Sequence, residues 1–355
     1  MQRFFVADGI VLPAVIAVSL VFAFITTPYV RAIAKKCGII DIPRDARRMH
    51  KRAVPLAGGG AMILAFVLSI TIFSMMNRGR VDVKGSLIMF GAFLCGACGL
   101  IDDIFTLKPM SKMAFQLVVS LFAAAFIGKI ESFTVFGRAF SLGFLSVPAT
   151  VFWIMLIMNA VNLMDGMDGL ASGVCASVAF ALSVVLFLRG EFALSVCACA
   201  ASGACLGFLC HNAAPASIFM GEVGSAFLGF TLAVLTLPCY STHDPDAAST
   251  ALLLFLLPVT EAVSSFLRRV LCGKNPFSPD KKHIHHLLYE NGFNAPQICL
   301  ILYVFASLSA LCAVIHTEYS VISVLILSLL MVFIRSMLTH KHKKSRKKEN
   351  RYEKT

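Results

Sequence analysis

The chain has 355 residues, of which 58% are hydrophobic and 14% are charged, and its mean hydropathy is +0.83. These values exclude a soluble globular protein and indicate an integral membrane protein. The formal net charge of +12 falls largely between the apolar runs and in a basic tail, so membrane lipid is the expected partner of this charge and no nucleic-acid partner is predicted.

The apolar runs predict an all-α, polytopic membrane protein. Each run is close to about 20 residues, the length that spans the hydrocarbon layer of a bilayer. Between the fourth and fifth runs, residues 131–144 alternate polar and apolar side chains and predict a short β-hairpin. We expect one transmembrane domain over residues 1–339 and a basic tail over 340–355. In chain order, the eleven predicted helices cover residues 10–29, 58–77, 86–101, 113–129, 147–163, 170–188, 193–210, 223–239, 250–267, 297–315 and 319–337.

Lysine and arginine decide the orientation of this bundle, because they are enriched on the cytoplasmic side of a membrane. With the N-terminus outside, the inner segments and the tail carry 24 of the 31 basic residues, and the outer segments carry seven. The predicted topology therefore has the N-terminus outside, the hairpin outside and the C-terminus in the cytoplasm.

Five polar segments fall on the predicted cytoplasmic side, at the ends of different helices. They gather carboxylates with an amide, which favours a hard divalent cation such as Mg²⁺. The neighbouring lysine, arginine and histidine side chains favour phosphate binding. The segments are 38–60, 99–112 with Asp102, Asp103 and Lys112, 159–170 with Asn162, Asp165 and Asp168, 211–225 with Glu222, and 268–286 with three histidines.

Each segment taken singly also has a plainer interpretation. What favours a site is that all five lie on one side of the membrane. The plainer interpretations are a polar loop start for Asp102-Asp103, a turn for Asp165 and Asp168, an interface lysine for Lys112, a helix-end residue for Glu222 and a soft-metal site for His283-x-His285-His286.

The order of these segments resembles the polyprenyl-phosphate N-acetylhexosamine-1-phosphate transferases, over residues 30–290. Within this superfamily the sequence is most similar to the bacterial undecaprenyl-phosphate N-acetylglucosamine-1-phosphate transferases of glycosyltransferase family 4, which start envelope glycans such as teichoic acids and O-antigens. The loop "SPDKKHIHH" and the tail favour this branch over the phospho-N-acetylmuramoyl-pentapeptide transferases. The stretches that carry the resemblance are Asp102-Asp103, "NLMDGMDGLASG" (162–173), "FMGEVGSAFLGF" (219–230) and "PFSPDKKHIHHLL" (276–288).

The resemblance implies a role for each candidate residue. It implies that Asn162 and Glu222 bind Mg²⁺, with Mn²⁺ as the alternative metal. Glu222 departs from the aspartate usual in the family, and its extra methylene moves the carboxylate by roughly 1.5 Å, which leaves the metal geometry open. The other implied roles are catalysis at the lipid phosphate for Asp102, Asp103 and Lys112, and binding of the nucleotide or sugar for Asp165, Asp168, Phe219, His283, His285 and His286.

The implied enzyme transfers N-acetylhexosamine-1-phosphate, with N-acetylglucosamine favoured as the sugar, from a UDP-sugar to undecaprenyl phosphate and releases UMP. It would act in the bacterial inner membrane with its site facing the cytoplasm, as a monomer or a homodimer. The acidic pair Asp102-Asp103 is open to three roles: general base, orientation of the metal or Lys112, and covalent nucleophile. The alternatives are phospho-N-acetylmuramoyl-pentapeptide transfer, another UDP-N-acetylhexosamine as donor, and a transporter, whose acids would sit nearer the bilayer midplane.

Overall fold

The computed structural model describes residues 2–42, 53–76, 83–135, 138–240, 247–273, 283–315 and 320–352. Three parts of the sequence interpretation fall outside this description. They are the basic segment 43–52, the proline-containing loop 274–282 and the side chains of the tail from residue 340 onward.

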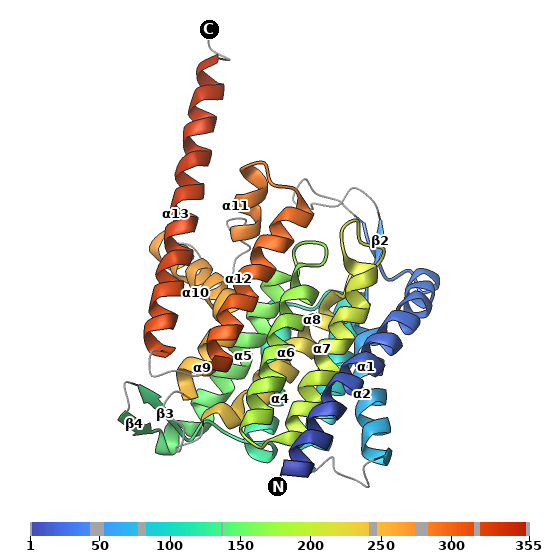
Figure 1. Ribbon diagram of the computed structural model, residues 1–355. Coiled ribbons are helices and arrows are strands. Elements are labelled where there is room, and N and C mark those ends of the chain that lie inside the picture. The colour runs from blue at the N-terminus through green and yellow to red at the C-terminus, as the bar shows by residue number, and fades with distance from the viewer. Residues whose placement is uncertain are drawn as a thin grey trace.

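Long helices packed side by side make up most of the molecule, and the described part of the chain also forms two small two-stranded antiparallel sheets at the ends of the bundle (Figure 1). The described elements are α1 Gln2–Lys36, β1 Ile40–Asp41, β2 Val54–Pro55, α2 Gly59–Met76, α3 Val83–Phe105, α4 Pro109–Phe126, β3 Ser132–Val135, β4 Arg138–Ser141, η1 Gly143–Leu145, α5 Ser146–Met164, α6 Leu170–Leu188, α7 Phe192–Asn212, α8 Gly221–Leu235, η2 Leu237–Tyr240, α9 Ala247–Leu254, α10 Leu256–Leu271, α11 Ile284–Glu290, α12 Ala295–Ile315 and α13 Ser320–Tyr352.

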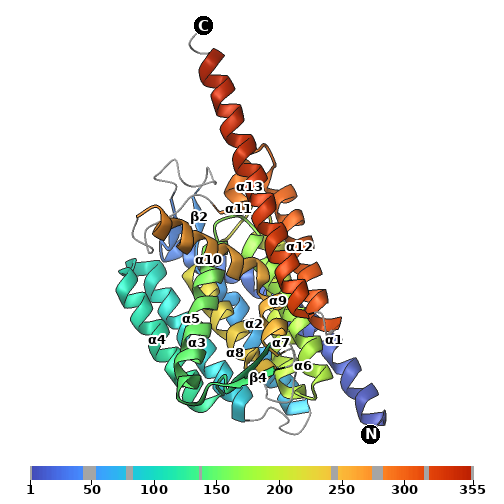
Figure 2. The same cartoon turned by 90° about the vertical axis from the view of Figure 1, so that its left-hand side faces the viewer.

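Within the described ranges, ten helices are long and apolar enough to cross a membrane, and the bent pair of α9 and α10 makes an eleventh if it counts as one span. This confirms the predicted all-α polytopic fold. The single helix expected over 250–267 is instead broken into two, because α9 and α10 meet at 85°. Pro258 accounts for the break: its ring would clash with the Leu254 carbonyl in a continuous helix, and it has no N–H to donate. As a result α10 runs across the bundle rather than along it (Figure 2).

The fully described connections that carry predicted polar segments lie at the same end of the bundle. The chain alternates in direction from α1 to α8, so the α3–α4, α5–α6 and α7–α8 connections lie together near α11 (Figure 1). The predicted hairpin is confirmed at the opposite end, where β3 and β4 pair with Ser132 opposite Ser141. The gathering of polar segments at one end is therefore a property of the fold.

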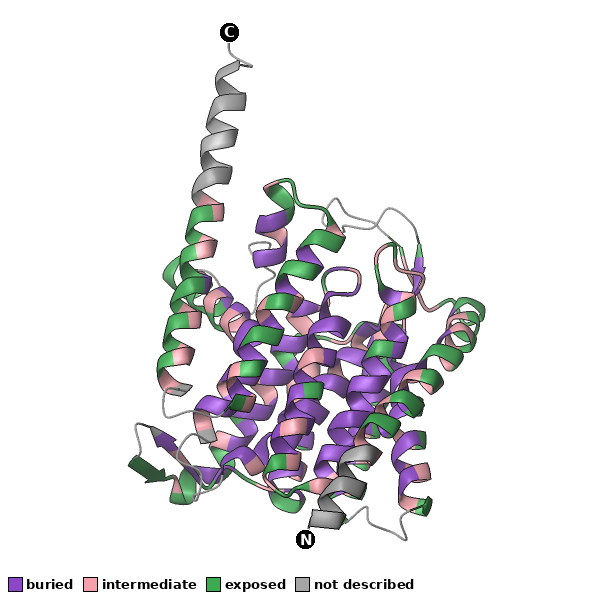
Figure 3. Cartoon of the chain, viewed as in Figure 1, coloured by how far each residue is buried: buried purple, intermediate pink, exposed green. Residues whose placement is uncertain are grey.

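The core lies in α6, α7 and α8, whose membrane-spanning stretches have the largest share of buried residues in the described chain (Figure 3). The outward faces of the surrounding helices carry large exposed apolar side chains, for example Phe24, Phe93 and Leu325. An exposed apolar surface of this extent fits contact with lipid.

Glycines let two helices approach the start of α8 closely. A methyl group at Gly99 of α3 would lie 2.6 Å from Val223 Cα and would collide with the Glu222 carbonyl. On α2, a methyl group at Gly59 would collide with the Gly224 main chain. The first turn of α8 is therefore held between α2 and α3 by direct contact with their backbones.

We expect Gly99→Ala to destabilise the protein by about 3 kcal/mol, because the helix backbones must separate to admit the methyl group. Gly60→Ala is the matched control, since its new methyl group would meet only Val30 Cγ1 at 3.9 Å. The measurement is thermal unfolding of the detergent-solubilised protein. Equal midpoints for the two variants would contradict the proposed close approach of α3 and α8.

Candidate active site

Glu222 stands at the centre of a polar cluster at the end of the bundle. It lies in the first turn of α8, and its Oε1 is 2.8 Å from Lys112 Nζ, which comes from the first turn of α4. Lys112 Nζ is also 2.5 Å from Asp102 Oδ2, at the end of α3. The lysine and the glutamate remain partly exposed, at 33% and 30% of their side chains, whereas Asp102 is buried. This ion-paired triad thus brings together three sequence-predicted residues and is open to a ligand.

Asn162 joins the same cluster from the last turn of α5. Its Nδ2 donates to Glu222 Oε2 at 2.7 Å and to Ser225 Oγ at 3.2 Å. The two candidate metal ligands are therefore neighbours. Ser225, one turn after Glu222 on α8, is a member of this cluster that the sequence analysis missed.

Asp103 faces a different partner from Asp102. Its Oδ1 accepts the Glu222 N–H at 2.9 Å, and its Oδ2 lies 3.4 Å from the Val223 nitrogen. These are N–H groups at the start of α8, which have no acceptor within their own helix. The helix dipole at this end also favours a negative charge. Asp103 therefore fixes the start of α8, and with it the position of Glu222.

The turn between α5 and α6 carries the two remaining aspartates. Asp165 is the first residue beyond α5, and Gly169 adopts φ 78° directly before α6 begins, a left-handed conformation that suits glycine. Burial raises the pKa of Asp165 well above its usual range, and the negative charges of Glu222, Asp103 and Asp168 raise it further. Asp165 therefore lies within electrostatic range of the Glu222 cluster.

Asp168 and Phe219 connect the α7–α8 loop to two other segments: Asp168 lies in the α5–α6 turn, and Phe219 lies in the loop itself and contacts the end of β2 and the segment between β2 and α2. Asp168 Oδ2 accepts the Ala216 N–H at 2.9 Å. The main chain of Phe219 hydrogen-bonds to Pro55 and Gly58, each at 2.9 Å. Both predicted residues thus contribute to loop–loop contacts beside the cluster.

Asn212, which was not among the predicted site residues, holds the α5–α6 turn against the α7–α8 loop. Its Oδ1 accepts from Gly169 N at 3.1 Å and from Ser172 Oγ at 2.8 Å, and its Nδ2 donates to Ile218 O at 3.1 Å. The available signal was an amide at the end of an apolar helix, in a segment already recognised as polar.

The three predicted histidines lie at the start of α11, and their rings are 4.4 to 6.4 Å apart between centroids. His285 is 3% exposed, and its Nε2 has no hydrogen-bond partner within the described chain. This nitrogen lies 3.1 Å from the position that a methyl group on Gly166 would take, so it faces the turn that carries Asp165. Burial, followed by the charges of His286 and His283, lowers the pKa of His285 well below its usual value, and the ring is neutral at pH 7.

The described residues hold no group of three or more histidine, cysteine, aspartate or glutamate side chains that could bind a metal ion unaided. Mg²⁺, however, commonly uses one or two protein carboxylates and completes its shell with water and substrate phosphates. Glu222 offers a partly exposed carboxylate, and a half-turn of the adjacent Asn162 amide presents its oxygen in place of its nitrogen. The donor set therefore fits a metal ion that is completed by a phosphate substrate.

The fold and this cluster define a polytopic membrane protein with a polar, phosphate-compatible site at one end of its helix bundle. The model of the family described as "Glycosyl transferase family 4" matches residues 86–239 of this chain. The chain is 31% identical to a probable undecaprenyl-phosphate N-acetylglucosaminyl 1-phosphate transferase of Bacillus subtilis, over 90% of this chain and 88% of that protein. It is 31% identical to a decaprenyl-phosphate N-acetylglucosaminephosphotransferase of Mycobacterium tuberculosis, over 85% and 82% of the two chains. An undecaprenyl-phosphate alpha-N-acetylglucosaminyl 1-phosphate transferase of Escherichia coli K12 is 30% identical, over 82% and 80%. The chain belongs to glycosyl transferase family 4.

Proposed function

We propose that this protein transfers N-acetylglucosamine-1-phosphate from UDP-N-acetylglucosamine to undecaprenyl phosphate and releases UMP. The observation that carries the proposal is the contact of Lys112, Glu222 and Asn162, from three different helices, at one end of a membrane-spanning bundle. The family membership and the names of the relatives support the same reaction. Helix-end acids fit phosphoryl transfer at the membrane surface better than transport through the bilayer midplane.

In the proposed reaction an oxygen of the lipid phosphate attacks the β-phosphorus of the UDP-sugar, and the bond from that phosphorus to the bridging oxygen breaks as UMP leaves. Asn162 and Glu222 would hold Mg²⁺ or Mn²⁺, which when bound neutralises charge that develops on the phosphate oxygens. Lys112 binds phosphate oxygens, and Asp102 keeps the ammonium group in place. His285 presents a neutral ring nitrogen toward the Asp165 turn, where it can donate or accept a hydrogen bond from the donor substrate.

The test is turnover by purified protein in lipid nanodiscs. Radiolabelled UDP-N-acetylglucosamine, undecaprenyl phosphate and Mg²⁺ are expected to give a labelled lipid diphosphate and free UMP. UDP-N-acetylgalactosamine and UDP-N-acetylmuramoyl-pentapeptide serve as competing donors. If either competing donor is turned over faster, its sugar replaces N-acetylglucosamine in the proposal. If none of the three donors gives a lipid product, the proposed reaction class is contradicted.

We further propose that the site faces the cytoplasm of a bacterial cell. The support is the excess of lysine and arginine in the segments at the site end. In a variant without other cysteines, the exposed Cys272 at the end of α10 is expected to resist a membrane-impermeant maleimide in intact cells and to react after permeabilisation. Ser141→Cys, exposed on the hairpin at the other end, is expected to react in intact cells. The reverse labelling pattern would overturn the orientation and the placement of the active site.

A further inference from the structure

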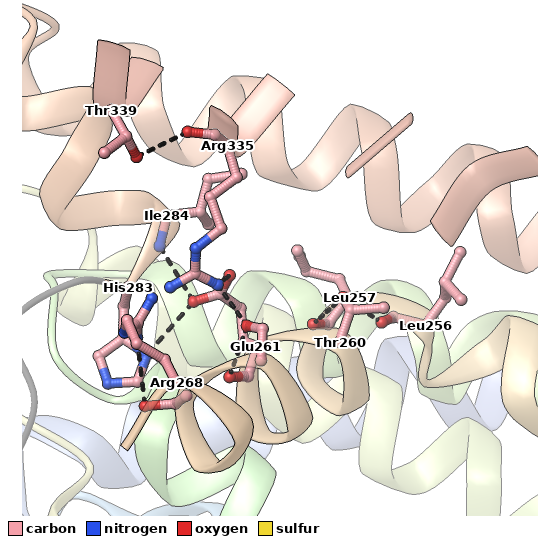
Figure 4. Close-up of polar contacts among 11 residues, drawn as sticks. Leu256, Leu257, Thr260, Glu261, Arg268, His283, Ile284, Arg335 and Thr339 are labelled. Carbon is pink, nitrogen blue, oxygen red and sulfur yellow. Dashed lines mark hydrogen bonds and ion pairs between the residues drawn. The ribbon is translucent and has the colours of Figure 1, made fainter. Parts of the chain in front are cut away.

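Glu261 is a buried carboxylate that the proposed chemistry does not use. It lies in α10 and is 5% exposed. Its Oε2 accepts the Ile284 N–H at 3.0 Å and lies 3.2 Å from His283 Nδ1 (Figure 4). Its Oε1 lies 3.3 Å from Arg335 Nη1 of α13. Burying a carboxylate is unfavourable unless it is paired and hydrogen-bonded, and here three residues from two segments, the start of α11 and α13, supply partners for one side chain.

The backbone contact identifies which segment Glu261 holds. Ile284 is the first residue of α11, so its N–H has no acceptor within that helix. His283 precedes α11 and provides no side-chain cap of its own. Glu261 therefore supplies from α10 the acceptor that the start of α11 lacks.

Arg335 connects this contact to the last membrane-spanning helix. Besides Glu261, it donates to Ser264 Oγ, one turn further along α10. Because α10 crosses the bundle after the break before Pro258, Glu261 lies between α11 and α13 (Figures 2 and 4). The same bend that the sequence analysis missed thus places an anionic group under the histidine segment.

The contact reaches the active site through two residues. The rings of His283 and His285 are nearly parallel, at 4° with centroids 5.7 Å apart. His285 Nε2 faces Gly166 in the turn that carries Asp165. A shift of the start of α11 therefore moves the His285 ring relative to the Glu222 cluster.

We propose that Glu261 is a positioning residue that sets the histidine segment, residues 283–286, against the active-site turn, with Arg335 as its counter-ion. The inference rests on the proposed function, because it takes the histidine segment to contact the UDP-sugar. It predicts an effect on donor binding and not on the lipid substrate. A carboxylate that merely stabilised the fold would reduce the fraction of active protein without changing either KM.

The experiment compares Glu261→Gln, Arg335→Met and the double variant with the control Glu290→Gln, which removes an exposed carboxylate from the far end of α11, the helix whose start Glu261 contacts. In Glu261→Gln and Arg335→Met we expect the KM for UDP-N-acetylglucosamine to rise about tenfold, and that for undecaprenyl phosphate to change less than about twofold. The double variant removes both charges while the glutamine oxygen still accepts from Ile284, so we expect it to bind the donor better than either single variant. Glu290→Gln is expected to match the wild type. Unchanged donor KM, or equal changes in both KM values, would overturn the inference.

Hydrogen–deuterium exchange tests the contact without using activity. Amides of residues 283–290 are expected to exchange faster in Arg335→Met and Glu261→Ala than in the wild type, while those of α6 keep their protection. If the wild-type protein proves inactive with every donor, the proposed function fails, but the exchange result still decides whether Glu261 holds the segment. Unchanged exchange in residues 283–290 would overturn the inference even in an active enzyme.

Discussion

Glu222→Ala is expected to lower kcat/KM by about a thousandfold, which corresponds to about 4 kcal/mol of lost transition-state stabilisation. Glu222 is the common partner of Lys112 and Asn162. Its removal therefore takes away a proposed metal ligand and also one hydrogen-bond acceptor of each of these two side chains. Asn162→Ala is expected to show a comparable loss. The measurement is initial rate against Mg²⁺ concentration in nanodiscs, with both substrates saturating in a second series.

Two controls accompany this experiment. Glu222→Asp restores the aspartate usual in the family and is expected to remain active with a changed preference between Mg²⁺ and Mn²⁺. Glu191→Ala removes an exposed carboxylate just before α7, at the opposite end of the bundle, and is expected to match the wild type. Near-normal rates of Glu222→Ala and Asn162→Ala at limiting Mg²⁺ would remove both residues from the proposed metal site. A folded but inactive Glu222→Asp would show that the cluster requires the longer side chain.

The second large effect is expected at the acidic pair, where Asp102→Asn and Asp103→Asn should each reduce kcat about a hundredfold at every pH between about 5 and 8.5. The geometry favours orientation over proton transfer. Asp102 already accepts the Leu107 N–H at 2.7 Å and pairs with Lys112, whereas Asp103 accepts from the main chain at the start of α8. Each carboxylate is thus engaged with a group that fixes Lys112 or Glu222.

The pH–rate profile distinguishes this role from that of a general base. A phosphate monoester has a second pKa of about 6, so the lipid phosphate needs help to lose its proton only at low pH. If either aspartate were the base, the defect of its asparagine variant would be largest below about pH 6 and would shrink above about pH 8. Recovery of either variant at high pH would therefore restore the base mechanism. Single-turnover trapping of a phosphorylated enzyme would favour the covalent alternative.

The local sequence predicted much of the fold because membrane helices can be recognised from the length and apolarity of a run of residues. The sequence predicted the hairpin at 131–144. It also predicted that the polar segments lie at one end, since helices that cross a membrane in alternating directions return every second connection to the same side. It missed the break between α9 and α10, although Pro258 was visible within the predicted helix. It also passed over Glu261, a single acid inside an apolar run, which is the kind of residue that signals a functional or paired site in a membrane helix.

The sequence by itself therefore determined the class of protein and the set of polar segments that supply the site. It also determined the number of membrane spans, if the bent pair of α9 and α10 is counted as one span. The partnerships within that set were decided only by the tertiary structure. Lys112 and Glu222 are 110 positions apart, and they meet because Gly99 lets α3 touch the first turn of α8. Glu261 meets Ile284 and Arg335 because a bent helix crosses between α11 and α13. Side-chain pairs of this kind depend on the packing distance and rotation of helices, and hydropathy and residue spacing along the chain carry no information about either quantity.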